Sequence, residues 1–419
     1  MFNFFCNKLP QYPLFNYEVS LIIDEQFTLT AELKSEYQSR VIEYARELLQ
    51  FESVTPDDAG CQAWIAKKLS MLGAKIDTFE SHGVSNLIAV ISNGDGPNLG
   101  FCGHTDVVPV GNLNKWQAPP FAGEIKNDYL IGRGIADMKG GIAAALVAAE
   151  MLVLEGSFVG RLWFLITSDE EGDALFGSCE IVKHFKDVKQ DLDYCIVGEP
   201  TSIKQCGDML KIGRRGALSF AIQINGKSAH VAYPTQGINA IHHACSIVKD
   251  LMKFDWDNRD SNQLGTTMQV THIDSGLYSD NVIPDSVIIN LNIRYTTAYS
   301  EDDLIHLVTH IVTRTTNDFL LTTSHACNPY YSAEISKNKL SLIKECQTVI
   351  NRCTGLFAKT STSGGTSDGR FFSDICPQVI ELGLTNGTIH QENERIHLSE
   401  LSNLTNIYFA LFKKLLCKQ

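Results

Sequence analysis

The chain has 419 residues, of which 44% are hydrophobic and 20% are charged, and its formal net charge is −13. This length exceeds what one ordinary hydrophobic core requires, so we expect two domains. The acidic balance argues against a nucleic-acid partner, and the longest apolar stretch is too short to span a membrane.

We treat residues 1–38 as an N-terminal extension, because they are rich in aromatic residues but lack the apolar core and cleavage site of a secretory signal. Beyond them, strands alternate with helices, a pattern typical of an α/β fold with a mostly parallel sheet and helices on both faces. Hydrophobic periodicity predicts helices at 41–50 and 61–72, strands at 86–91 and 99–102, a helix at 142–154, a strand at 161–167, a helix at 179–185 and a strand at 194–197.

The rhythm of the sequence changes after Gly216. The elements predicted next are strand 218–225, helix 238–252, strands 267–273 and 287–295, helix 302–313 and strand 319–323. This β-α-β-β-α-β order is typical of a ferredoxin-like domain. The α/β pattern resumes with helix 340–351, strand 378–382 and helix 398–415. We therefore predict a catalytic domain of residues 39–215 and 329–419, interrupted by an inserted domain of residues 216–328.

Five short segments in loops or at predicted strand ends hold side chains that can bind metal. The candidate ligands and their neighbours are His104, Asp106, Asp137, Glu170, Glu171, Glu199 and His390. Taken alone, each segment also fits an ordinary role, such as a loop His, an N-capping Asp or a solvated acidic turn. Together they place two His and several carboxylates where an open α/β sheet binds its ligands. Adjacent carboxylates are costly without a cation, so the set predicts a two-metal hydrolytic centre.

The twelve cysteines are scattered along the chain and form no Cys-x-x-Cys pair. This spacing disfavours a structural zinc knot and a redox motif. A chain of this size needs no disulfides, so we expect free thiols in a reducing cytoplasm.

Four of the segments resemble the dinuclear zinc family of aminoacylases and carboxypeptidase G, and the likeness covers roughly residues 40–419 in order. They read His-Thr-Asp-Val-Val-Pro, Gly-Arg-Gly-Ile-Ala-Asp-Met-Lys-Gly, Ser-Asp-Glu-Glu-Gly and Gly-Glu-Pro-Thr. The resemblance implies a hydrolase that binds two Zn²⁺ per subunit, with Co²⁺ able to substitute.

The resemblance also implies a role for each side chain of the centre. His104 and Glu199 would bind one zinc, Glu171 and His390 would bind the other, and Asp137 would bridge them. Asp106 would orient His104, Glu170 would act as the general base, and the peptide bond after Asp137 would be cis.

Further segments, at 53–62, 213–216, 364–371 and 388–394, resemble members of the family that hydrolyse N-succinyl-LL-2,6-diaminopimelate to succinate and LL-2,6-diaminopimelate. This likeness implies a cytoplasmic enzyme of lysine and diaminopimelate biosynthesis. Two alternatives stay open. One is another N-acyl amino acid deacylase, such as an acetylornithine deacetylase or an aminoacylase. The other is a catalytically inactive dimeric binding protein on the same fold. Ala217, where the family usually has Ser, puts one substrate contact in doubt.

The family likeness extends to the inserted domain and implies a homodimer. His230, in a Gly-Lys-Ser-Ala-His segment, would reach the active site of the partner subunit and stabilise the oxyanion. The positions that resemble substrate contacts are Arg214, Tyr233, Asn281, Arg294, Gly365, Thr366 and Asn386. Arg214, Arg294 and the backbone of Gly365 and Thr366 are candidates to bind carboxylates, because Arg offers a planar fork of donors.

Overall fold

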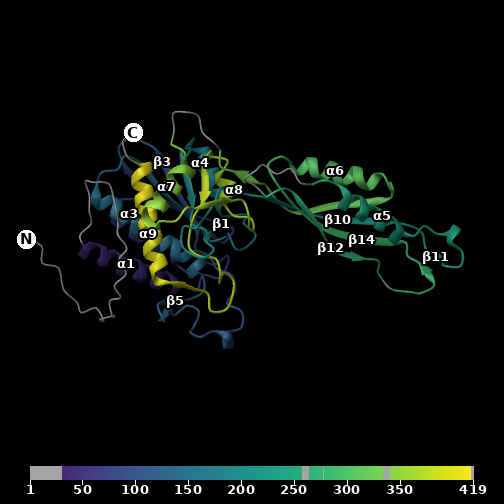
Figure 1. Cartoon of the computed structure of the whole chain (residues 1–419), viewed down its shortest axis with the longest axis horizontal. Helices are drawn as coiled ribbons and strands as arrows, with labels where there is room; N and C mark the ends of the chain where they lie inside the picture. Colours follow the sequence, from purple (N-terminus) through teal and green to yellow (C-terminus); the bar gives the residue numbers. More distant parts are fainter. Residues whose placement is uncertain (1–30, 257–263, 277, 334–339, 417–419) are drawn as a thin grey trace, which may run out of the picture.

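The computed structural model describes residues 31–256, 264–276, 278–333 and 340–416. The molecule is elongated, with a large body at one end and a smaller lobe at the other (Figure 1). We define the body as an eight-stranded sheet with its helices, and the small lobe as a separate four-stranded sheet with two helices.

Parallel pairing predominates in the centre of the body sheet. Strands β6, β3, β7 and β18 pair in parallel, and so do β8 and β17 at one edge. The other pairs, including β1 with β2, are antiparallel. In spatial order the strands are β1 (Lys75–Ser81), β2 (Val84–Asn93), β6 (Gly160–Thr167), β3 (Asn98–His104), β7 (Tyr194–Val197), β18 (Val379–Glu381), β8 (Met209–Lys211) and β17 (Lys359–Ser361).

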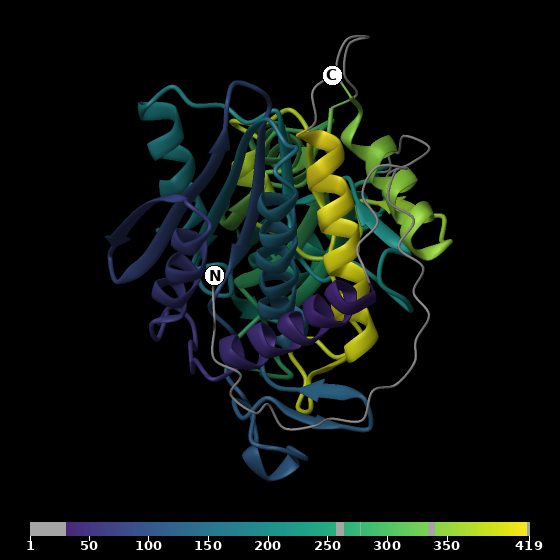
Figure 2. The same ribbon diagram turned by 90° about the vertical axis from the view of Figure 1, so that its left-hand side faces the viewer.

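Helices cover both faces of this sheet, as expected of the predicted α/β fold. One face carries α1 (Ala31–Leu49), α2 (Cys61–Met71), α3 (Gly140–Glu155), α7 (Leu342–Thr354) and α9 (Leu398–Leu415). Figure 2 looks onto this face, where α1 lies across α3 and α9. The other face carries α4 (Ser178–Asp187) and the short α8 (Gly369–Phe372). A small sheet of β4 (Glu124–Lys126), β5 (Tyr129–Ile131) and β19 (Arg395–His397) lies beside the main one.

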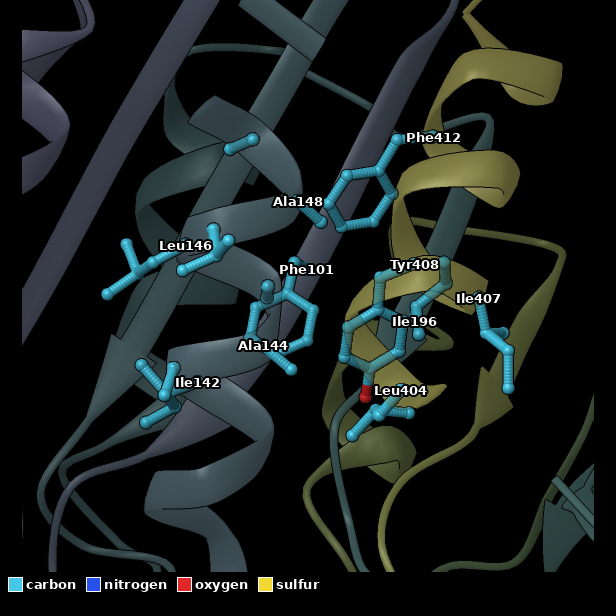
Figure 3. Close-up of a cluster of buried hydrophobic side chains, with 14 of the residues drawn as sticks. Phe101, Ile142, Ala144, Leu146, Ala148, Ile196, Leu404, Ile407, Tyr408 and Phe412 are labelled. Atoms are coloured by element: carbon cyan, nitrogen blue, oxygen red, sulfur yellow. The ribbon is translucent and has the colours of Figure 1, made fainter. Parts of the chain in front are cut away.

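The main hydrophobic core lies between the body sheet and the α3–α9 pair (Figure 3). Helix α3 is apolar on almost every side, because it is buried between the sheet and its neighbouring helices. Phe101 of β3 and Tyr408 of α9 meet edge to face, with ring centroids 5.5 Å apart. This packing fixes the strand ends that hold the site described below.

The small lobe has an antiparallel sheet of four strands in the order β12, β14, β10 and β15, and α5 and α6 pack on it. Along the chain the order is β-α-β-β-α-β, as the sequence predicts. The elements are β10 (Gly216–Asn225), α5 (Ala240–Lys253), β12 (Thr267–Asp274), β14 (Ser286–Tyr295), α6 (Glu301–Thr313) and β15 (Phe319–Cys327). Two short strands, β11 (Ala229–His230) and β13 (Val282–Ile283), pair with each other.

The chain passes between body and lobe at two adjacent points. It leaves through β9 (Gly213–Arg214) and returns through β16 (Tyr330–Tyr331), and these two strands pair with each other. The predicted limits of the inserted domain, 216 and 328, lie at this crossing. Its independence as a domain and its role in dimerisation stay predictions.

The expected elements differ from the observed ones mainly at their ends and at short strands. Helix α1 begins at Ala31, so it includes the last residues of the predicted N-terminal extension, while residues 1–30 lie outside the described residues. The sequence patterns did not predict β1, β8 or β17, because these strands at the margins of the sheet have mixed polarity or only three residues.

Within the described ranges, no helix is both long and apolar enough to cross a membrane. Every cysteine in these ranges is a free thiol, as expected.

Candidate metal centre

Three neighbouring strands of the body end at the same edge and deliver acidic and imidazole side chains there. His104 is the last residue of β3, Glu170 and Glu171 follow β6, and Glu199 follows β7. Because β3 pairs in parallel with both β6 and β7, the carboxyl ends of the three strands lie side by side.

The remaining two predicted ligands come from irregular segments. Asp137 lies in η2 (Ile135–Lys139), with non-helical φ and ψ of −125° and 90°, and its peptide bond to Met138 is cis, as expected. His390 has a positive φ of 60° in the loop between β18 and β19. Their positions therefore depend on contacts made by loops.

The other four predicted ligands lie in two pairs on the two sides of the Asp137 carboxylate. His104 Nε2 lies 3.3 Å from Asp137 Oδ1 and 3.7 Å from Glu199 Oε1. On the other side, His390 Nε2 lies 3.3 Å from Asp137 Oδ2 and 2.9 Å from Glu171 Oε1. This arrangement gives two groups of nitrogen and oxygen donors that share one carboxylate.

Three buried atoms of the cluster have no hydrogen-bond partner among the residues that the structure describes: His104 Nε2, Asp137 Oδ1 and Glu199 Oε1. Unpaired buried polar atoms are rare because each one costs free energy. A divalent cation bound here would remove that cost, because imidazole and carboxylate are ordinary ligands for one. His104, Asp137 and Glu171 form one group close enough to hold an ion, and His104, Glu170 and Glu199 form another. The residues present thus fit a bound metal.

Asp106 supports the cluster from behind. His104 Nδ1 donates to the backbone oxygen of Asp106 at 2.8 Å, and the Asp106 carboxylate is further away, at 3.5 Å. With its proton on Nδ1, the imidazole presents a lone pair on Nε2 toward Asp137 and Glu199. The Asp106 carboxylate accepts the backbone N–H groups of Glu170, at 3.3 Å, and Glu171, at 3.0 Å. One residue therefore orients a ligand from each of two strands.

The three consecutive acidic residues after β6 lie in different environments. Asp169 accepts the backbone N–H groups of Leu175 and Phe176 and holds the turn that follows. Glu171 contacts His390. The carboxylate of Glu170 lies within 4.8 Å of the ligand atoms of His104 and Glu199, where a general base could reach a water molecule.

The carboxylates repel one another strongly at this centre. Burial raises the pKa of Glu199 well above its usual value, and the charges of Asp137 and Glu170 add to this. Burial likewise raises the pKa of Glu170, against the effect of His104. Hydrogen bonds that the His390 ring donates to the carboxylates of Asp137 and Glu171 raise its pKa to about 10. Bound cations would stabilise the ionised carboxylates in place of protons.

The predicted contacts of the small lobe lie far from this cluster within one chain. His230 belongs to β11, at the end of the lobe opposite the body (Figure 1). Tyr233 and Asn281 are exposed and lie in the same region, where the N–H of Val231 donates to the Asn281 carbonyl at 3.1 Å. A single subunit therefore does not bring these residues to the metal ligands.

Of the other predicted substrate contacts, Arg214 is already hydrogen-bonded within the protein, and the rest lie on β14 or in loops of the body. Arg214 donates from Nε and Nη2 to the buried Glu381, and from Nη1 to the Ser363 carbonyl at 2.8 Å. A contact between Arg214 and a substrate carboxylate would require this pair to open. Arg294 lies on β14, opposite Ala217 of β10. Gly365 is exposed, and Thr366 and Asn386 are half-buried in loops of the body.

The predicted set of site residues omitted a buried ion pair. Glu394 and Arg133 are buried, and Arg133 Nη1 lies 2.8 Å from Glu394 Oε2. It also omitted Asp368, whose pKa burial raises to about 6. The Gln-x-Asn-Glu and Gly-Gly-Thr-Ser-Asp-Gly segments contained both acids, but only a structure shows that these carboxylates face inward.

A close contact between two backbones fixes the spacing of the cluster. A Cβ placed on Gly141, at the start of α3, would lie 2.8 Å from the carbonyl oxygen of Gly198, the residue before Glu199. The helix that follows Asp137 thus packs directly against the strand exit that holds Glu199.

Comparison with known proteins places this geometry in context. The model of peptidase family M20/M25/M40 matches residues 100–414. Succinyl-diaminopimelate desuccinylase 1 of Alteromonas mediterranea is 44% identical over 373 residues, which cover 88% of this chain and 95% of that protein. Succinyl-diaminopimelate desuccinylase 2 of Shewanella loihica is 42% identical over 375 residues, covering 88% and 99%. These relatives confirm the resemblance that the motifs indicate.

Solved structures are similar over nearly the whole chain. Aminopeptidase PepT from Bacillus cereus has a TM-score of 0.72 at 21% identity and covers 90% of this chain and 98% of its own. The YXEP protein of Bacillus subtilis, a dinuclear metal-binding peptidase from the M20 family, has a TM-score of 0.68 at 16% identity, covering 91% and 99%. At these identities the likeness establishes the fold alone.

Proposed function

This chain belongs to peptidase family M20/M25/M40, and from that membership and its site we propose that it is a succinyl-diaminopimelate desuccinylase. It hydrolyses N-succinyl-LL-2,6-diaminopimelate to succinate and LL-2,6-diaminopimelate, a reaction of lysine and diaminopimelate biosynthesis. The observation that carries the proposal is the pair of donor groups on the two sides of Asp137, in a chain 44% identical to a protein of that name.

The proposed cofactors are two Zn²⁺ per subunit, for which Co²⁺ can substitute. His104 and Glu199 would hold one ion and Glu171 and His390 the other, with the Asp137 carboxylate shared between the two groups. The chemistry that a pair of divalent ions supplies when bound is polarisation of the carbonyl and a lowered pKa for water.

Glu170 moves the proton during hydrolysis. It accepts a proton from the water that attacks the succinyl amide carbonyl, as the new C–O bond forms. It then donates this proton to the amine nitrogen as the C–N bond breaks, which releases succinate and the free amine of the product. The proposal is supported by the position of its carboxylate beside His104 and Glu199.

The proposed enzyme is a cytoplasmic homodimer. In a dimer, His230 of one subunit donates to the developing oxyanion in the site of the other, where fixed donors are most effective. Tyr233, Asn281, Arg294, Asn386 and the Gly365–Thr366 backbone contact the substrate, and Arg214 does so when its pair with Glu381 opens. The exposure of β11, far from the metal ligands of its own chain, favours a role across subunits.

The test is an assay of the zinc-loaded full chain on N-succinyl-LL-2,6-diaminopimelate and, in parallel, on N-acetylornithine. We expect turnover of the succinyl substrate to exceed that of the acetyl substrate by at least about 100-fold in kcat/KM, a usual margin for a site that binds a charged group. The reverse preference would assign the chain to an acetyl deacylase. Metal analysis of the same sample, with no ion bound and no turnover of either substrate, would assign it to a binding protein.

A further inference from the structure

The backbone around Asp137 makes a sharp turn in η2 (Ile135–Lys139), before helix α3 begins at Gly140. The N–H groups of this buried segment need acceptors, because an unpaired buried N–H group costs free energy. The group that accepts them also determines where the Asp137 carboxylate lies.

The carboxylate of Glu394 accepts N–H groups of this segment and of Gly134 just before it. Glu394 Oε1 accepts from the backbone of Ala136 at 2.8 Å and of Asp137 at 3.2 Å. Its Oε2 accepts from the backbone of Gly134 at 3.0 Å and from Arg133 Nη1 at 2.8 Å. The four donors pair both oxygens of a fully buried side chain, whereas Oδ1 of Asp137 stays unpaired and faces His104.

The same ion pair joins three segments that contain predicted ligands. Arg133 Nη2 also donates to the carbonyl of Pro109, at 3.3 Å, in the segment that follows His104. Glu394 closes the loop of His390, and the next residues form β19, which is fixed by pairing with β5. A shift of Glu394 would therefore move Asp137 and His390 together.

The neighbouring Asn393 strengthens this anchor. Its side chain accepts the backbone N–H of Gln117 at 2.5 Å and donates to the carbonyl of Lys115 at 2.8 Å. The loop of His390 is thus attached on one side to residues 115–117 and on the other to the backbone of η2 around Asp137. His390 itself is exposed, so the loop conformation is the main constraint on its position.

We propose that Glu394 is a positioning residue of the metal centre: by accepting the backbone N–H groups of Gly134, Ala136 and Asp137, it fixes the Asp137 carboxylate relative to His390. This inference rests on the proposed metal centre but not on the identity of the substrate. Glu394 should matter most for the ion proposed to bind Glu171 and His390, because Glu394 closes the loop that contains His390.

The experiment measures metal binding by full-length, metal-stripped protein, with Co²⁺ alone followed by its visible absorption and Zn²⁺ measured against a competing chelator. In the Glu394→Gln variant, the side-chain NH₂ group would face backbone N–H groups, so that donors meet and some lose their acceptor. We expect the affinity for one of the two ions to fall by about 10- to 100-fold, which is the usual effect of removing a group that orients metal ligands. Glu394→Asp keeps the charge and recovers part of this affinity.

The matched control is Glu155→Gln. Glu155 is buried at the other end of α3 and pairs with Lys413. This variant is expected to lose stability but to bind both ions as the wild type does. Should Glu394→Gln fail to fold, Arg133→Met removes only one of the four donors, and it is expected to show a smaller loss of affinity in a folded protein.

The outcomes separate the inference from the proposed function. Unchanged affinity for both ions in Glu394→Gln, or in a folded Arg133→Met, overturns the inference. Equal losses of affinity in the Glu394 and Glu155 variants reduce it to general destabilisation and also overturn it. A selective loss in the Glu394 variant, in a protein whose wild type hydrolyses no N-succinyl substrate, supports the inference and refutes the proposed function.

Discussion

The body and the small lobe are both sheets covered by helices, but among the described residues the candidate metal ligands gather in the body alone. In the body, parallel strands end at a common edge, and His104, Glu171 and Glu199 meet there. In the lobe, antiparallel strands end alternately at opposite edges, so its polar side chains are spread along the sheet. The proposed function therefore assigns the chemistry to the body, and residues of the lobe could take part in it only if another subunit or a domain movement brought them to the body.

The largest expected effect tests the role of the body. Glu170→Gln keeps the shape of the side chain but removes the base, so kcat should fall by about 10²–10⁴-fold. Metal content, measured on the same sample, should stay at the wild-type level. Normal turnover by a fully metal-loaded variant would refute the role assigned to Glu170.

Removal of metal should separate the stabilities of the two regions. Ions present at about 1,000 times their dissociation constant stabilise the folded state by about 4 kcal/mol. All five ligands lie in the body, so chelation should increase hydrogen exchange in β3 and η2 and leave the lobe strands β10 and β14 unchanged. An equal increase in hydrogen exchange in both regions would show that they unfold as one unit.

His230 tests whether the lobe acts across a dimer. Loss of one oxyanion donor typically lowers kcat by about 10²–10³-fold, and we expect a loss of this size in His230→Ala. A mixture of the His230→Ala and Glu170→Gln proteins should recover about a quarter of wild-type activity. Half of randomly formed dimers would contain one subunit of each kind, and each of these dimers would have one of its two sites intact. If activity did not recover when the two variants exchange subunits, His230 would act in the site of its own subunit or would have no role in catalysis.

A smaller effect of pH is expected beside the crossing between the two regions. Burial and the charge of Arg214 lower the pKa of Lys211 to about 8, from 10.5. Below pH 8 the folded protein holds a charged, buried Lys at a cost in stability, and the cost disappears as the pH rises from 8 to 10.5. The free energy of unfolding should therefore rise over this range less in Lys211→Met than in the wild type. Urea titrations at several pH values would measure the difference, and parallel curves would contradict it.

The smallest effect concerns the lobe alone. Ser300 caps α6 by accepting the N–H of Asp303 at 3.1 Å. Ser300→Ala should destabilise the lobe by about 1 kcal/mol without altering metal affinity. A change in metal binding would show a coupling between lobe and body that the separate hydrophobic cores do not suggest.

The sequence predicts the strongly periodic elements well, because burial imposes their pattern. The helix 398–415 is predicted with its observed limits, because apolar side chains recur along almost the whole length of the buried helix α9. Strand β1 escapes prediction because it lies at the edge of the sheet and alternates only weakly. The three-residue strands β8 and β17 hold too little pattern to distinguish them from a loop.

The candidate site, like the fold, is only partly predictable from the sequence. Side chains that follow strands, such as His104 and Glu199, can be expected to meet because parallel strands share an edge. The pairing of Arg214 with Glu381 and of Arg133 with Glu394 joins positions far apart in the chain, and no local pattern encodes it. The division of labour among Asp169, Glu170 and Glu171 likewise depends on which neighbour each one faces.

The contact of Gly141 with the carbonyl of Gly198 has a consequence for protein engineering. A methyl group at position 141 would act as a wedge between two backbones, neither of which can move aside as a flexible side chain can. The wedge would push the strand exit with Glu199 away from the helix start behind Asp137. In a library of variants of this chain, we therefore expect position 141 to accept no residue other than glycine.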